Sequence, residues 1–199
     1  MKGITDFIVQ IDFPYHEKHK TENGTEFFLD KRWSANMLAN TKAKIYSLPL
    51  AESSGLKKGD EVIIDPTLLF EQNYFLMHGN QESVFLVDKE NSLYKIKPSM
   101  ILLYRESENH EWVGYLENIL CKPIEVSNTE VKSSVIFIPE VAKPKHEENL
   151  FEVCFCSENS EVKKGDKIIL SDKDLFVELY VEGKKFYWVR EQNVIAKAA

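Results

Sequence analysis

The 199-residue chain contains no apolar run close to the length that a bilayer requires. A membrane-spanning helix needs about 20 consecutive apolar residues. The first residues, 1–6, are polar and form too short a stretch for a signal peptide. We therefore expect neither a membrane segment nor a membrane partner, and a cytoplasmic location.

Cysteine is also scarce, with only Cys121, Cys154 and Cys156 in the chain. An odd number of thiols in a chain of this length does not indicate a disulfide framework, and a reducing compartment suits it. On a strand, Cys154 and Cys156 would point to the same face. A zinc site would need two more ligands at a matching spacing, which the chain lacks, so we interpret the cysteines as small buried apolar side chains.

Concentrated positive charge is missing too. Lys and Arg number 25 against 32 Asp and Glu, for a net charge of −7, and the basic residues are scattered along the chain. Because binding to a phosphate backbone requires clustered cations, we expect no nucleic-acid partner.

Motifs that indicate catalysis are absent as well. The chain has no glycine-rich phosphate loop, no Ser-His-Asp order and no Cys-His nucleophile signature. His16 and His19 could suggest a metal, but a solvated charged loop explains them without one. We expect no enzyme activity, no catalytic residue, no cofactor and no metal.

An internal repeat is the strongest positive signal. Residues 56–64, LKKGDEVII, recur as residues 162–170, VKKGDKIIL, at an offset of 106. Each copy predicts a glycine turn followed by a strand of branched residues. Flanking segments repeat in the same order, 7–12 with 119–124 and 94–102 with 187–195, which indicates a duplication.

The repeat divides the chain into two predicted domains, 1–104 and 118–199, joined by a charged linker at 105–117. Each half consists of short apolar segments separated by turns, the pattern of an all-β barrel or sandwich. Residues 176–189 predict a hairpin with Gly183 in its turn. A weak helical pattern covers residues 31–43.

Two long polar segments occupy equivalent places in the halves. Residues 17–31 are polar except for Phe27, Phe28 and Leu29, and residues 127–149 are polar except for Val141 and a four-residue apolar run. That run consists of Val135, Ile136, Phe137 and Ile138. Because connections in compact domains have a median of about 4–6 residues, segments of this length are commonly functional or disordered.

These residues resemble the chaperonin-10 family of small co-chaperonins. The similarity lies chiefly in residues 162–170 and in 187–197, YWVREQNVIAK. In that family a Val-Lys-x-Gly-Asp turn starts a strand, a hairpin follows, and the chain ends in an acidic turn and a short apolar strand. The similarity is strong over 118–199 and weaker over 5–104, and it implies all-β architecture with two tandem GroES-like β-barrel domains and long loops.

The resemblance also implies a function. Family members carry a mobile loop whose apolar tip docks on the ATP-bound chaperonin ring. Here the corresponding tips would be Phe27, Phe28 and Leu29 in the first half, and Val135, Ile136, Phe137 and Ile138 in the second. The chain would then be a ring-forming homo-oligomer that caps a chaperonin and assists ATP-dependent protein folding.

The sequence departs from the family at several positions. Ser134 and Val135 replace the family's double glycine in one half, and Gly24 lies three residues before the apolar tip in the other. The roof hairpin is shortened to residues 51–54 and 157–160, as in roofless phage-encoded co-chaperonins, which would place the protein in a host cytoplasm. A chain with two domains cannot fill seven places of a ring with whole subunits.

Two alternatives stay open at the level of sequence. The apolar segments could be ordinary core strands of their own domains. The chain could also be a duplicated barrel that has become a structural or interaction protein and does not bind a chaperonin.

Overall fold

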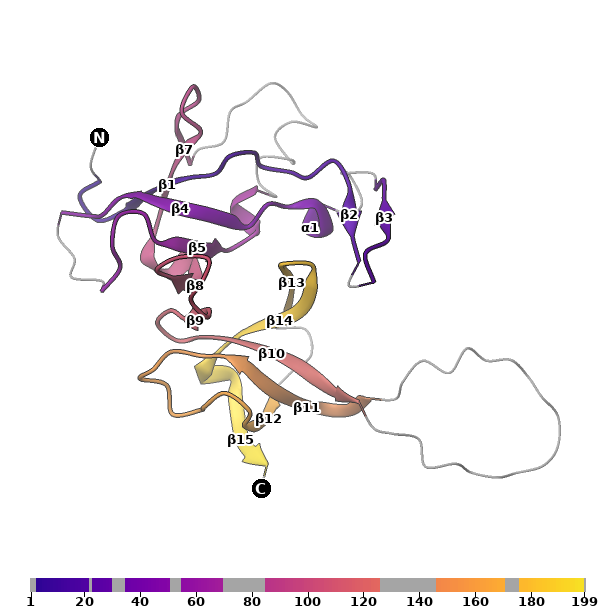
Figure 1. Ribbon diagram of the computed structural model, residues 1–199. Helices are drawn as coiled ribbons and strands as arrows, with labels where there is room; N and C mark the ends of the chain where they lie inside the picture. The colour runs from indigo at the N-terminus through magenta and orange to yellow at the C-terminus, as the bar shows by residue number, and fades with distance from the viewer. Residues whose placement is uncertain are drawn as a thin grey trace, which may run out of the picture.

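The computed structural model describes residues 3–21, 23–29, 35–50, 55–69, 85–125, 146–170 and 176–198. Within them the chain is predominantly β, as predicted, and all strand pairs are antiparallel. Two large sheets, one from each half of the chain, lie one above the other in Figure 1, with the small β2–β3 hairpin at one side. Within the described residues, no helix is both long and apolar enough to cross a membrane.

The first sheet has seven strands in the order β6-β7-β1-β4-β5-β8-β9. In chain order these strands are β1 (Phe7–Gln10), β4 (Lys42–Ser47), β5 (Glu61–Ile64), β6 (Leu86–Asp88), β7 (Leu93–Ile96), β8 (Ile101–Arg105) and β9 (Val113–Gly114). Side chains of β4 alternate between buried and exposed, since successive residues of a strand face opposite sides of the sheet. All four residues of β5 are buried, as expected for a strand rich in branched apolar residues at the middle of a sheet.

The second sheet has six strands in the order β13-β14-β10-β11-β12-β15. These strands are β10 (Asn118–Glu125), β11 (His146–Phe155), β12 (Lys167–Leu170), β13 (Val177–Val181), β14 (Lys184–Arg190) and β15 (Val194–Ala198). The predicted hairpin is present: β13 and β14 pair around a two-residue turn, with Val181 opposite Lys184. Both turn residues have positive φ, 51° at Glu182 and 80° at Gly183.

The two sheets have the same strand order. Matching β1, β4, β5, β6, β7 and β8 with β10, β11, β12, β13, β14 and β15 reproduces every neighbour relation. A one-turn 3-10 helix precedes the last matched strand in each half, η1 (Pro98–Met100) before β8 and η3 (Glu191–Asn193) before β15. The shared topology agrees with the internal repeat in the sequence.

The repeated Lys-Gly-Asp turn has the same hydrogen bonds in both halves. In the first half, the Lys57 N–H donates to the Asp60 carboxylate (2.7 Å) and the Gly59 N–H donates to the Ile45 carbonyl (2.8 Å). The Asp60 carbonyl in turn accepts from the Ile45 N–H at 2.9 Å. The second half repeats these three bonds at Lys163, Gly165, Asp166 and Val153, at 2.8, 2.8 and 2.9 Å.

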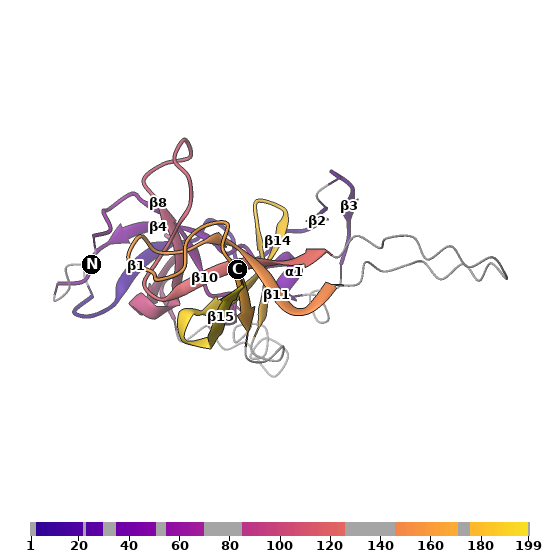
Figure 2. The ribbon, with the colours of Figure 1, turned by 90° about the horizontal axis from the view of Figure 1, so that it is seen from below.

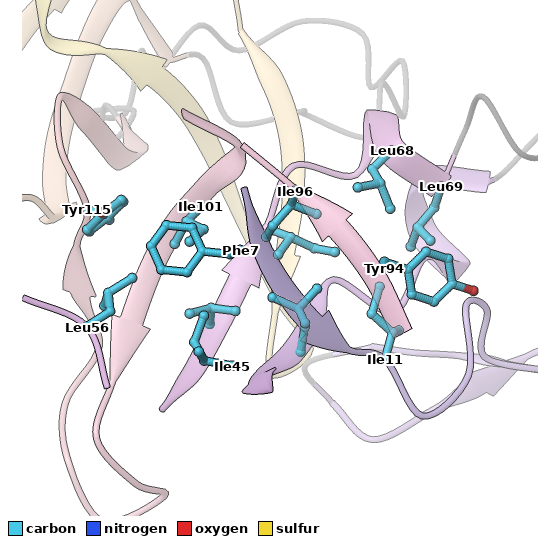
Figure 3. Packing of buried hydrophobic residues seen from close by; sticks show 14 of the residues in the cluster. Phe7, Ile11, Ile45, Leu56, Leu68, Leu69, Tyr94, Ile96, Ile101 and Tyr115 are labelled. Atoms are coloured by element: carbon cyan, nitrogen blue, oxygen red, sulfur yellow. The ribbon is translucent and has the colours of Figure 1, made fainter. Parts of the chain in front are cut away.

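Three clusters of buried apolar residues hold the sheets together. The first lies within the first sheet and includes Phe7, Ile45, Ile96 and Ile101, whose side chains converge in Figure 3. The third lies within the second sheet around Ile119, at equivalent strands. The second cluster joins the two sheets: Ile63, Leu102, Leu103 and Trp112 pack with Leu120, Leu179, Val181 and Phe186.

Buried polar contacts also link the sheets. The Asn118 side-chain amide donates to the carbonyls of Ile101 and Tyr115, both at 2.9 Å, and its oxygen accepts from the Trp188 indole at 2.9 Å. Gly114 lies against the second sheet, where its N–H donates to the Cys156 carbonyl at 2.9 Å. The sheets therefore meet through close-packed, hydrogen-bonded contacts.

Finer features of the structure concern the segments predicted as barrels, linker and helix. Within the described residues, neither large sheet closes into a barrel through its edge strands. The segment predicted as a linker contributes β9 to the first sheet and two buried aromatic side chains, Trp112 and Tyr115. Of the described residues in the predicted helix, Ala35–Leu38 form α1, and Lys42 already belongs to β4, where pairing with β5 overrides a weak helical pattern.

Candidate functional site

The first predicted docking segment lies on a hairpin between β1 and β4. Its two short strands, β2 (His19–Lys20) and β3 (Glu26–Phe27), pair with His19 opposite Phe27 and Lys20 opposite Glu26. The predicted long loop at 17–31 therefore contains a regular hairpin, which in Figures 1 and 2 projects at one side of the molecule.

Local hydrogen bonds form the turn of this hairpin. The N–H of Thr21 donates to the Thr25 carbonyl (2.9 Å), and the N–H of Gly24 donates to the Thr21 carbonyl (2.9 Å). The Thr21 hydroxyl also accepts from the Thr25 N–H at 3.2 Å. Gly24 has φ of 80°, a conformation that glycine adopts without the steric cost of a Cβ.

The apolar residues of the hairpin are open to solvent. Phe28 is 78% exposed and Phe27 is 49% exposed, while Leu29 is partly buried. The Lys18 ammonium lies 4.9 Å from the centre of the Phe28 ring and pairs with Glu26 at 3.1 Å. The two Phe side chains are thus exposed apolar groups that the described part of their own sheet does not bury.

The base of the hairpin rests on the second half of the chain. His19 is buried, with Nδ1 3.1 Å from the Met37 carbonyl and its ring edge-to-face with Tyr180 of β13 at 5.0 Å. Gly183, in the β13–β14 turn, is so close that an added Cβ would lie 3.7 Å from the Lys20 carbonyl oxygen. Contacts with another part of the fold therefore position the hairpin.

A cavity of about 500 Å³ lies between the hairpin, α1 and the β13–β14 turn. Among the described residues, four lysines line it, Lys18, Lys20, Lys42 and Lys184, together with one acidic side chain, Glu182. Sequence reasoning did not find this cavity, because its walls come from segments up to 168 residues apart, from His16 to Lys184. The only available signal was the His16 and His19 pair, which marks one edge.

The second predicted docking segment, Val135, Ile136, Phe137 and Ile138, lies outside the described residues. By its position in the chain it belongs to the connection between β10 and β11, the strands that match β1 and β4. In Figures 1 and 2 the ends of β10 and β11 at residues 125 and 146 face the same side of the molecule as the hairpin. The strand β11 begins at His146, inside the segment predicted as a loop.

The other residues considered in the sequence as candidates for a site are the three cysteines and His16. Burial raises the pKa of the Cys121 thiol to about 12, and it also raises the pKa of Cys154 and Cys156. These thiols are therefore protonated at neutral pH. His16 packs on Phe13 at 5.0 Å, and burial lowers its pKa. Within the described part of the chain, no group of three His, Cys, Asp or Glu side chains is arranged to hold a metal.

No protein-family model matches the sequence, and no curated protein matches it either. Inferences about function therefore depend on the hairpin, the cavity and the shared topology of the two sheets.

Proposed function

We propose that the protein is a co-chaperonin made of two tandem chaperonin-10-like units, and that it binds an ATP-bound chaperonin ring through exposed apolar residues. The observation that carries the proposal is the exposure of Phe27 and Phe28 on a preformed hairpin. This hairpin occupies the same connection in the first half as the second apolar segment does in the other half.

Exposure of two adjacent aromatic side chains favours a partner that covers them. Burying one large apolar side chain is worth about 1.5–3 kcal/mol. The turn hydrogen bonds and the contact of His19 with Tyr180 hold the hairpin in place before any partner binds. The entropy cost of ordering it on binding is therefore reduced.

The shared topology supports the tandem part of the proposal. Both halves have the same strand order, the same hydrogen-bonded Lys-Gly-Asp turn and the same 3-10 helix before the last matched strand. Each chain would then supply two docking segments. Several such segments on one homo-oligomeric ring would bind a symmetric partner by raised effective concentration, although each contact alone is weak.

The proposal is tested by capture on a chaperonin ring. The purified protein is mixed with a GroEL-type chaperonin in ATP, in ADP or without nucleotide, and co-elution is measured by size-exclusion chromatography. We expect co-elution that requires nucleotide. A refolding assay with a chaperonin-dependent substrate then measures whether the protein assists folding.

Three variants separate docking from stability. Phe28→Ser and Phe137→Asp should each weaken co-elution while leaving the melting temperature unchanged. Ile4→Ser is the matched control, because Ile4 is 73% exposed and lies near the N-terminus, which Figures 1 and 2 place at the opposite end from the hairpin. Equal loss in all three variants would contradict the proposal, and failure to co-elute in any nucleotide would favour an interaction protein with another partner.

A further inference from the structure

The cavity below the hairpin has an unusual charge for this protein. The chain as a whole carries a net charge of −7, yet the described residues that line the cavity include four lysines and one acidic side chain. A volume of about 500 Å³ is within the range of small-molecule sites, about 300–1,000 Å³. The cavity is therefore large enough for a ligand rather than for a few waters alone.

Local ion pairs neutralise only part of this positive charge. Lys42 pairs with Glu61 at 3.0 Å, and Lys18 pairs with Glu26. Glu182, the acidic residue among the described lining residues, is engaged elsewhere: its carboxylate accepts from Arg105 at 2.9 Å and from the Trp112 indole at 3.3 Å. Within the described residues no ion pair engages Lys20 or Lys184, and both side chains are exposed.

The fold brings the backbone segments that carry these two lysines together from opposite halves. Lys184 follows Gly183, whose backbone lies against the carbonyl of Lys20 as described above. Both side chains line the same cavity, so their two positive charges favour an anion bound there. Lysine ammonium groups bind phosphate as point charges.

A less polar wall adjoins the two lysines. Tyr180 is half-buried beside the cavity, and Met37 and Ala39 line it from α1 and the chain that follows. An aromatic side chain of this kind offers a face for a planar apolar group. The cavity thus combines charge for an anion with a surface for a ring.

We propose that this cavity binds a nucleotide-sized phosphate ester, with its phosphate groups between Lys20 and Lys184 and its ring against the Tyr180 wall. This inference goes beyond the proposed function and does not depend on it, because the site needs no second protein.

The test is isothermal titration of the intact protein with ATP in the absence of magnesium and of any chaperonin. We expect a dissociation constant below about 1 mM, and the double substitution Lys20→Gln with Lys184→Gln should weaken binding by about tenfold or more. The double substitution Lys95→Gln with Lys167→Gln is the matched control, since it removes the same charge from exposed strand positions outside the cavity. It should change binding by less than about twofold.

Three outcomes would overturn the proposal. ATP could fail to bind at millimolar concentration. Both double variants could weaken binding equally, which would show diffuse attraction to the protein surface. Inorganic tripolyphosphate could bind as tightly as ATP, which would remove the role of the Tyr180 wall. Melting curves of each variant show whether the fold is retained.

Discussion

At the scale of single residues, Glu61 and Arg105 form a buried ion pair between neighbouring strands of the first sheet, and Arg105 also reaches Glu182 of the second half. Arg105 Nε is 2.7 Å from Glu61, and its Nη1 is 2.9 Å from Glu182 in the β13–β14 turn. The guanidinium also lies 4.2 Å from the centre of the Trp112 ring. A planar guanidinium can donate to several acceptors and stack at once, which a lysine cannot do.

This pair makes stability depend on pH. Burial pushes the pKa of the Glu61 carboxyl upward, but the hydrogen bonds and charges of Lys42 and Arg105 outweigh burial and hold that pKa below its ordinary value of 4.5. A carboxyl with a lowered pKa in the folded state stabilises the fold fully above the unfolded pKa. That contribution is lost as the pH falls through the folded pKa.

We therefore predict that Glu61→Gln lowers the free energy of unfolding at neutral pH, and that its difference from the unaltered protein shrinks as the pH falls below 4.5. Urea unfolding between neutral and acid pH measures this difference. Glu90→Gln, at an exposed position, is the control and should follow the unaltered protein throughout. A difference that grows on acidification would contradict the prediction.

At the scale of elements, the Lys-Gly-Asp turn sets the start of the matched strands β5 and β12. Gly59 and Gly165 have φ of 96° and 90°, in the region that residues with a Cβ avoid. An added Cβ would meet no atom within 4 Å at either site. Any cost of substitution is therefore conformational rather than a clash with neighbours.

We predict that Gly59→Ala and Gly165→Ala each destabilise the protein by about 1–2 kcal/mol, because a positive φ strains the backbone of an alanine. Thermal unfolding measures both, and Lys58→Ala, in the same turn but exposed, should have little effect. Similar losses at the two glycines are expected from their matching hydrogen bonds. A loss at one glycine only would show that the turns are not equivalent.

At the scale of the whole molecule, the two sheets pack against each other through a shared apolar core. Leu102 and Leu103 of the first sheet and Leu120 of the second are fully buried in the same cluster. Asn118 adds three hydrogen bonds across or beside this contact. Because neither sheet could unfold without exposing part of the other's core, we expect the halves to unfold together.

Gly114→Ala tests this coupling. An added Cβ would lie 2.4 Å from the backbone carbonyl carbon of Cys156, so the two sheets would have to separate to accommodate it. We predict a single unfolding transition in the unaltered protein, followed in urea by tryptophan fluorescence and circular dichroism. In the variant we predict a loss of about 1–3 kcal/mol. Two separate transitions in the unaltered protein would contradict a shared core.

The sequence by itself determined the β architecture and the internal repeat. Both depend on local signals. One signal is the run of branched residues after a glycine turn, and the other is the Glu182-Gly183 turn of the hairpin. Each acts over a few neighbouring residues. The sequence also singled out Phe27 and Phe28 as an apolar group in a polar segment, but it left open whether they are exposed or buried in the core.

Only the tertiary structure decided how the two halves meet. The burial of Trp112, the use of residues 113–114 as an edge strand and the lysine-lined cavity all depend on contacts between residues far apart in the chain. The same is true of the pairing between Lys42 and β5, which ended the predicted helix. Such contacts arise from packing of whole elements, and a local pattern of residues does not encode which distant surface will cover it.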